Sequence, residues 1–332
     1  MKKCFFLLLV LCLLLCSCQA QRKQYSVTYL DLFDTVTTIQ GIADNEETFD
    51  DIAMQIHDQL LQYHRLFDIY NTYNGIVNLK SINDNAGIQP ITVDSAIIEL
   101  LTDCKQYYQD SNGIVNVAMG NVLRLWHEAR NDGIQHPESA YLPSADSLQK
   151  AAQHIDFSCV EIDRENATVY ITDPQTQLDV GAIAKGWALQ QVAENAPRGL
   201  LINSGGNICV TGEKDGSTPW TVGIAHPDGG SFLEQIRLTE GCVVTSGDYQ
   251  RCYTVAGKSY HHIIDPNTLY PSPYWRSVTV ICRNSAVADM LSTALFILPQ
   301  EDGQALLEQY NAQAMWMDAD GNLSYSSGFP LS

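Results

Sequence analysis

The order of strand-patterned and helix-patterned segments places the strongest limit on the fold of this chain. Apolar and polar side chains alternate over residues 25–42, which predicts strands, whereas residues 45–66 and 94–109 repeat apolar residues at helical spacing. Strand patterns dominate from residue 157 onward and are interrupted by helical patterns near 183–192 and 284–298. Because strands and helices do not alternate one by one, we predict an α+β fold, a single large domain of mixed sheets with packed helices, rather than a doubly wound sheet.

Turn residues divide the strand-rich half into hairpins. Residues 160–172 read as one hairpin, and residues 199–212 read as two strands joined by Gly205 and Gly206. Residues 314–327 predict a closing hairpin. The paired glycines would also let the backbone pass close to a ligand, but a tight turn is the simpler interpretation.

The first 20 residues have the composition of an export signal. Lys2 and Lys3 precede an unbroken apolar run that ends in small residues. The run is shorter than the roughly 20 residues that a membrane-spanning helix needs, so an uncleaved anchor is the less favoured interpretation. Leu-Cys-Ser-Cys at residues 15–18 resembles a bacterial lipobox, in which Cys18 becomes the acylated first residue of the mature chain.

These features predict how the chain is divided and where it is located. We expect a signal peptide over residues 1–17, a polar tether over 18–24 and one folded domain over 25–332. The mature protein is expected to be exported and lipid-anchored to the bacterial membrane on its periplasmic side.

Charge and cysteine usage argue against two classes of site. The formal net charge of −19 should repel nucleic acid, and no local basic patch offsets it. Outside the signal, the cysteines form no Cys-x-x-Cys pair, which argues against a cysteine metal site. Cys209 and Cys282 lie in apolar strand-like runs, so buried free thiols are the favoured interpretation, with a disulfide as the open alternative in an exported protein.

Residues 178–192, LDVGAIAKGWALQQV, concentrate small and charged residues at a predicted strand-to-helix turn. Asp179 is expected to end a strand, and a helix is expected to begin near Ile183. Gly181 and Ala182 keep the backbone bare, so that a phosphate can approach the free N–H groups of the helix start. Lys185 in the first turn opposes the helix dipole and should therefore have an anionic partner. A Gly-rich turn kept for steric reasons alone is the alternative.

Residues 245–266 contain possible acid–base groups. His261, His262 and Asp265 can exchange protons, and Arg251 can face an anion. Because neighbouring residues on a strand point to opposite sides, we expect at most one of the two histidines to act in the site.

Asp289 and Thr293 are four residues apart in a predicted helix, so that their oxygens lie on one helix face. One carboxylate and one hydroxyl suit Mg²⁺, which takes few protein carboxylates and completes its shell with waters and substrate phosphates. A threonine that only bonds back to its own helix is the alternative.

Five stretches also carry a family resemblance. They resemble, in order, the successive motifs of the ApbE family, the FAD:protein FMN transferases, and read LDVGAIAKGWA, LINSGGNI, VVTSGDYQR, HHIIDPNTLYP and SVTVICRNSAVADMLSTALF. The likeness runs from about Tyr25 to the C-terminus and implies an ApbE-like domain. Family members are exported, often lipid-anchored, Mg²⁺-dependent proteins that bind FAD, move its FMN half onto a Thr or Ser hydroxyl of a target flavoprotein and release AMP. The resemblance implies FAD as substrate, Mg²⁺ as cofactor and, as acceptor, an exported flavoprotein subunit of a membrane redox complex.

The resemblance also implies roles for individual positions. The metal ligands would be the backbone carbonyl of Ala182 and the side chains of Asp289 and Thr293. The positions that match FAD-binding residues are Phe33, Tyr70, Ile114, Val115, Asn116, Asp179, Lys185, Ile263 and Ile264. Phe33 stands where many members have Met, and Asn116 replaces an expected Asp, so that contacts from 114–116 are expected through backbone groups. For the base that takes the proton from the incoming hydroxyl, we nominate His262 or Asp265.

Two other functions remain open from the sequence. A FAD pyrophosphatase would use the same metal site with water as the nucleophile and would release free FMN and AMP. A non-catalytic FAD-binding lipoprotein would store or scavenge FAD without turnover. Product analysis in the absence of a protein acceptor separates the transferase from the pyrophosphatase.

Overall fold

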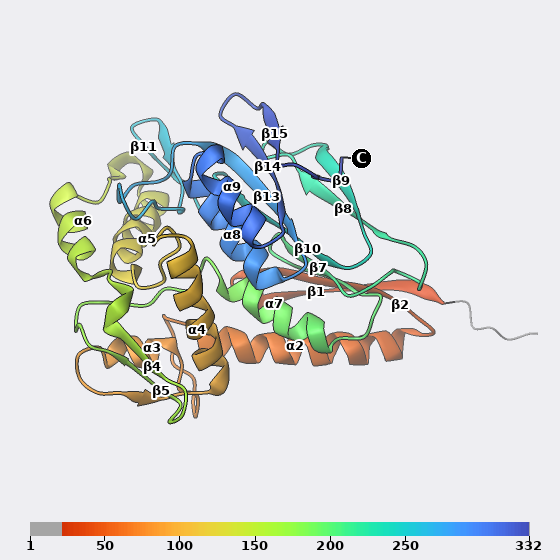
Figure 1. Ribbon diagram of the computed structural model, residues 1–332, viewed down its shortest axis with the longest axis horizontal. Coiled ribbons are helices and arrows are strands. Elements are labelled where there is room, and N and C mark those ends of the chain that lie inside the picture. The colour runs from red at the N-terminus through yellow and green to blue at the C-terminus, as the bar shows by residue number, and fades with distance from the viewer. Residues whose placement is uncertain (1–21, 332) are drawn as a thin grey trace, which may run out of the picture.

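An eight-stranded antiparallel sheet forms the centre of the computed structural model, which describes residues 22–331 (Figure 1). In spatial order its strands are β1 (Lys23–Leu32), β2 (Thr35–Ala43), β6 (Leu201–Ser204), β7 (Asn207–Val210), β10 (Gly241–Gly247), β13 (Trp275–Cys282), β14 (Gln313–Asp318) and β15 (Leu323–Tyr325). All neighbouring strands in this sheet pair antiparallel, which confirms the predicted α+β class. The expected signal peptide and the acylated Cys18 lie outside the described residues, as does most of the tether. Across residues 22–331, each helix is too short or too polar to traverse a lipid bilayer.

Three small sheets flank the large one. They comprise β3 (Ile91–Thr92), β5 (Thr168–Ile171) and β4 (Val160–Asp163), then β8 (Trp220–Ala225) with β9 (Phe232–Leu238), and β11 (Tyr253–Val255) with β12 (Lys258–Tyr260). The hairpins predicted at 160–172, 199–212 and 314–327 are confirmed as β4–β5, β6–β7 and β14–β15. Gly205 and Gly206 form the β6–β7 turn with φ of 59° and 93°, a conformation that glycine adopts without cost.

The α-helices are α2 (Glu46–Phe67), α3 (Leu79–Asp84), α4 (Ser95–Asp110), α5 (Gly120–Gln135), α6 (Ala145–Ala151), α7 (Ala184–Asn195), α8 (Ser285–Ile297) and α9 (Gln300–Gln309). Asp94 caps the start of α4, because its carboxylate accepts the Ala96 N–H at 2.9 Å. The sequence did not predict α5, whose buried face includes Asn121 and Gly133 and therefore gives only a sparse apolar pattern.

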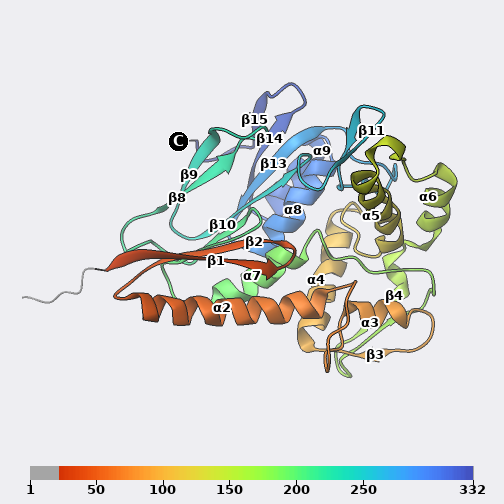
Figure 2. The same ribbon diagram turned by 180° about the vertical axis from the view of Figure 1, so that it is seen from behind.

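The two faces of the large sheet are covered differently. Helices α2, α7 and α8 lie on one face, and the β8–β9 hairpin lies on the other (Figures 1 and 2). Side chains alternate between the two cores, so that Cys242 and Val244 of β10 belong to the helix-covered core and Val243 to the opposite one. A third, smaller core holds α5 against β11 through Trp126 and Tyr253. Together these cores hold the loops at one end of the sheet in place.

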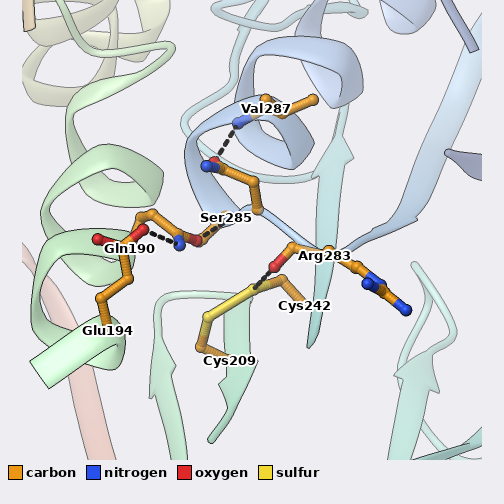
Figure 3. Close-up of a disulfide and its surroundings, with 8 residues drawn as sticks. Gln190, Glu194, Cys209, Cys242, Arg283, Ser285 and Val287 are labelled. Carbon is orange, nitrogen blue, oxygen red and sulfur yellow. Dashed lines mark hydrogen bonds between the residues drawn. A yellow bond between two sulfur atoms is a disulfide. The ribbon is translucent and has the colours of Figure 1, made fainter. Parts of the chain in front are cut away.

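A disulfide joins Cys209 and Cys242 across the neighbouring strands β7 and β10 (Figure 3). The two residues are direct register partners, and their Cα atoms are 4.4 Å apart. The expectation of a free thiol is therefore wrong for Cys209, because strand pairing, which residue spacing does not reveal, places its sulfur beside that of Cys242. Cys282 is the next residue along the same row and is free and buried, as expected.

Candidate functional site

A cavity of about 600 Å³ gathers nearly all of the nominated residues. It is lined by the β1–β2 tip, the chain after α2, the start of α7, the end of β10, the segment after β12 and helix α8. The nominated residues that line it are Phe33, Tyr70, Ile114, Val115, Asn116, Asp179, Ala182, Lys185, His262, Ile263, Ile264, Asp289 and Thr293. Asp265, the alternative base, is not among the lining residues.

The buried side of the cavity is the contact between α7 and α8. The Gly186 N–H donates to Oδ2 of Asp289 at 2.8 Å, and Nζ of Lys185 lies 3.8 Å from the same oxygen. Asp289 is therefore the anionic partner that Lys185 required. Burial raises the pKa of Asp289, whereas the Lys185 charge and then the Gly186 N–H act to lower it. A carboxylate that is only 4% exposed in this way favours a bound cation.

Gly186 is a site residue whose role the sequence analysis missed. A Cβ at this position would lie 2.4 Å from both Cβ of Asp289 and the carbonyl oxygen of Ser285. Only glycine therefore allows α7 to approach α8 closely enough for the hydrogen bond to Asp289. A signal existed, because glycine inside a helix costs about 1 kcal/mol relative to alanine and needs a packing reason.

The segment before α7 does not form the predicted strand. Asp179 follows an isolated bridge at Gln177 and lies outside any strand. The side-chain amide of Asn83 replaces a strand partner here, since it donates to the Leu178 carbonyl at 2.9 Å and accepts the Leu178 N–H at 2.7 Å. The prediction of a strand was wrong because the pairing stops at a single bridge. Gln177 and Asp179 bond to the backbone of Gly120 and Val117, whereas both backbone groups of Leu178 bond to a distant side chain.

Asp179 nevertheless lies at the turn into α7 as expected. Its carboxylate accepts the Gly181 N–H at 2.9 Å. Burial raises its pKa, whereas the Gly181 N–H and the charges of His127 and Arg251 act to lower it. The helix begins at Ala184, after Ile183 as N-cap, close to the predicted start.

The tip of the β1–β2 hairpin places Phe33 at the cavity. Phe33 and Asp34 form a two-residue turn, both with φ of 51°, between the paired residues Leu32 and Thr35. Nδ1 of His64 accepts the Phe33 N–H at 3.1 Å, and the two rings meet edge to face at 5.5 Å. The contact with α2 thus offsets the strain of a left-handed Phe backbone.

The two adjacent histidines both line the cavity, although a strand would have pointed them to opposite sides. They follow β12 in irregular chain, so strand alternation does not separate them. In His261 both ring nitrogens are engaged, Nε2 with the Ser272 carbonyl at 2.9 Å and Nδ1 with the Ile263 N–H at 3.2 Å. His261 is therefore held in a structural role.

His262 has the tautomer of a base. Its Nδ1 lies 3.2 Å from the Gln250 carbonyl, which can only accept, so that Nδ1 carries the proton and Nε2 has a free lone pair. Burial and then the nearby Arg251 charge lower the pKa of His262 to about 3. The imidazole is consequently neutral at neutral pH.

Two nominated side chains are engaged within the protein. The Asn116 amide donates to the Ile155 carbonyl at 2.8 Å and accepts the Ala118 N–H at 2.9 Å, which leaves backbone groups for a ligand. Oδ1 of Asp265 accepts the Asn267 N–H at 2.8 Å and shapes the turn that follows.

The rim of the cavity contains residues that the sequence did not single out. The Tyr70 hydroxyl lies 3.1 Å from Nδ1 of His127, and Nη2 of Arg130 lies 3.5 Å from Nε2 of that histidine. Partial desolvation at the cavity rim, and then the Asp179 charge, raise the pKa of Tyr70 to about 12. His127 and Arg130 lie on α5, and because that helix was not predicted, nothing in the sequence indicated that they would reach the site.

The side chains that line the cavity combine oxygen atoms that can bind a metal ion with positively charged groups. Within the described part of the chain, no group of three His, Cys, Asp or Glu residues forms a metal cluster. Asp289 and Thr293 still offer hard oxygen ligands, which suit a cation that takes its remaining ligands from water and phosphate. Lys185, Arg130 and Arg251 add positive charge, so the cavity favours an anionic ligand.

Comparisons with known proteins give one consistent answer. The family model described as the ApbE family matches residues 28–316. A protein of Klebsiella pneumoniae (strain 342) named FAD:protein FMN transferase is 31% identical over 272 residues, 78% of this chain and 82% of that protein. A protein of Treponema pallidum (strain Nichols) with the same name is 33% identical over 274 residues, 75% of this chain and 73% of that protein. The crystal structure of the ApbE protein of Thermotoga maritima superposes with a TM-score of 0.81 at 27% identity, covering 92% of this chain and 97% of that one.

Proposed function

The chain belongs to the ApbE family, and on that premise we propose that it transfers the FMN half of FAD to a Thr or Ser hydroxyl of a target flavoprotein, releasing AMP in a Mg²⁺-dependent reaction. Its curated relatives are named as transferases, and the chain is accordingly an enzyme of that class. The observation that carries the proposal is that a buried carboxylate, a lysine and a neutral histidine line one cavity: Asp289, Lys185 and His262.

The donor set fits Mg²⁺. Asp289 is buried, its pKa is raised by burial, and it lines the cavity together with Thr293 and the Ala182 segment. Asp289, Thr293 and the Ala182 carbonyl would hold the ion, and the shortage of further carboxylates suits a cation that keeps open positions for phosphate oxygens. When bound, Mg²⁺ would neutralise part of the charge on the diphosphate.

Three side chains have separable tasks in the proposed transfer. Lys185 binds the diphosphate electrostatically, and its contact with Asp289 keeps it at the buried side of the cavity. Nε2 of His262 accepts the proton of the acceptor hydroxyl as the oxygen bonds to phosphorus. Tyr70, which is 55% exposed at the rim, offers a ring for contact with the flavin.

The proposed acceptor is an exported flavoprotein subunit of a membrane redox complex. An enzyme anchored through acylated Cys18 on the periplasmic side would meet such an acceptor at the membrane surface. The chain's negative charge argues against a nucleic-acid partner.

The test is direct labelling of an acceptor. Purified protein is incubated with FAD, Mg²⁺ and a Thr-bearing acceptor domain, then resolved by in-gel fluorescence and mass spectrometry. We expect the acceptor to gain the mass of covalent FMN and one AMP to be released per label. An acceptor with that Thr replaced by Val is the matched control and should stay unlabelled.

The rival functions give different products in the same experiment. Free FMN and AMP without a labelled acceptor would identify a pyrophosphatase. Binding of FAD without any product, unchanged in Asp289→Ala, would identify a non-catalytic flavin carrier. Chelation by EDTA should abolish labelling and added Mg²⁺ should restore it; labelling that survives chelation contradicts the metal requirement.

A further inference from the structure

Arg251 is an unpaired cation in the cavity wall. Between residues 22 and 331 its side chain makes no hydrogen bond or ion pair, although other arginines, such as Arg198 and Arg276, pair with carboxylates. Within that range, none of the chain's 38 acidic residues pairs with this guanidinium, which lines the cavity and is therefore free to meet an anion that arrives with the ligand.

The loop that contains Arg251 also sets the tautomer of His262. The Gln250 carbonyl bonds to Nδ1 of His262 and thereby selects its tautomer, and Arg251 is the next residue. Arg251 is also the foremost charge that lowers the pKa of His262, and it acts to lower that of Asp179. Arg251 therefore lines the same cavity as the nominated base and directly follows the residue that bonds to it.

The backbone of Arg251 is strained. Its φ is 48°, in the left-handed region that L-residues other than glycine seldom adopt. Strained residues of this kind gather at functional sites, where the surrounding structure holds them in place.

We propose that Arg251 is a further catalytic residue, whose guanidinium contacts the phosphates of the dinucleotide and stabilises the charge that develops on them during transfer. This inference rests on the proposed FMN transfer and adds a residue to it. In the step, the acceptor oxygen bonds to the phosphorus of the FMN half, and the bond from that phosphorus to the bridging oxygen breaks. AMP leaves with the bridging oxygen, and the hydroxyl proton passes to Nε2 of His262. Arg251 offers planar paired donors that match phosphate oxygens.

The experiment compares Arg251→Gln, Arg251→Lys and Arg251→Gly with the wild type. Single-turnover FMN transfer is measured at saturating FAD, and the FAD dissociation constant is measured separately by calorimetry. We expect Arg251→Gln to lower the transfer rate constant by about 10²–10³-fold, as loss of one charge-stabilising donor does, while the dissociation constant changes far less. Arg251→Lys should keep part of the rate. Millimolar guanidinium should restore part of the rate of Arg251→Gly, an effect that a merely structural role would not produce.

Two controls separate charge from strain and position. Ala256→Gly relieves the same kind of backbone strain, at φ 49°, in the β11–β12 turn without removing a charge. Arg124→Gln removes an exposed arginine of α5 that pairs with Glu128. Both should transfer FMN at the wild-type rate.

Several outcomes would overturn the inference. It fails if Arg251→Gln transfers FMN within about threefold of the wild-type rate. It also fails if the loss in rate equals the loss in FAD affinity, because Arg251 would then bind FAD and the transition state equally well. It also fails if folded Arg251→Gly gains nothing from guanidinium. A wild type that does not transfer FMN, whether or not it cleaves FAD, refutes the proposed function itself, and this inference with it. A wild type that transfers FMN beside an unaffected Arg251→Gln refutes only the role of Arg251.

Discussion

The amide of Gly186 and the carboxylate of Asp289, 103 residues apart in the sequence, are joined by a hydrogen bond of 2.8 Å that ties the start of α7 to α8. The bond requires the absence of a side chain at 186, because a Cβ there would lie 2.4 Å from Cβ of Asp289. The two helices therefore set the position of the buried carboxylate jointly.

Gly186→Ala should disturb both stability and activity. The added methyl group must push α7 away from α8, and overpacking of this kind costs about 1–3 kcal/mol. We expect a lower free energy of unfolding in urea and a loss of FMN transfer. Asn195→Ala, at the exposed end of the same helix, should change stability by less than about 0.5 kcal/mol. Wild-type stability in Gly186→Ala would contradict the close approach of the helices.

Thr293→Val should weaken the response to Mg²⁺. Valine keeps the shape of threonine but removes the hydroxyl oxygen that would bind the ion. We expect the Mg²⁺ concentration for half-maximal labelling to rise by about 10–100-fold, the scale of losses at a metal site. Thr293→Ser, which keeps the hydroxyl, is the matched control and should stay near the wild type. Equal Mg²⁺ dependence in the two variants would exclude Thr293 as a ligand.

His262 should act as a base over a broad pH range. Its pKa in the folded protein is lowered from 6.5 to about 3, so the imidazole is neutral, and able to accept a proton, at every pH above that value. We expect the single-turnover transfer rate to show no break near pH 6.5 between pH 5 and 8. His262→Gln should lower that rate by about 10²–10⁴-fold at every pH.

The lowered pKa of His262 should also make the stability of the folded protein depend on pH. Because the unfolded imidazole binds a proton below about pH 6.5 and the folded one does not until about pH 3, the contribution of His262 to stability is present above 6.5 and is lost as the pH falls toward 3. Urea midpoints measured from pH 7 to pH 4 should therefore fall less steeply in His262→Gln than in the wild type. Parallel curves would refute the lowered pKa.

Reduction of the Cys209–Cys242 disulfide should lower stability. The bond closes a loop between residues 33 apart in the sequence, for which chain entropy gives a loss of about 3–4 kcal/mol on reduction. We expect thiol reductant to lower the Tm of the wild type. The Cys209→Ala, Cys242→Ala double variant should start at the lower Tm and should not respond to reductant; a wild type indifferent to reductant would count against the bond.

Local features of the molecule were predictable from the sequence alone. The Asp94 cap of α4, the Gly205-Gly206 turn and the hairpins depend on hydrogen bonds and side-chain periods that span only a few residues. The order of these elements indicated the α+β class, and the motifs that resemble ApbE proteins indicated the lining residues. All of this information lies in short stretches of sequence, which determine their own conformation.

Only the tertiary structure decided which distant residues meet. Asn83 holds Leu178 in place of a strand partner, Cys209 lies beside Cys242, and α5 brings His127 to Tyr70. These contacts join segments 33 to 95 residues apart, so they form only when core packing offsets the entropy of closing the intervening chain. Short-range sequence patterns do not predict these contacts, because nothing in the residues next to each side chain indicates its distant partner.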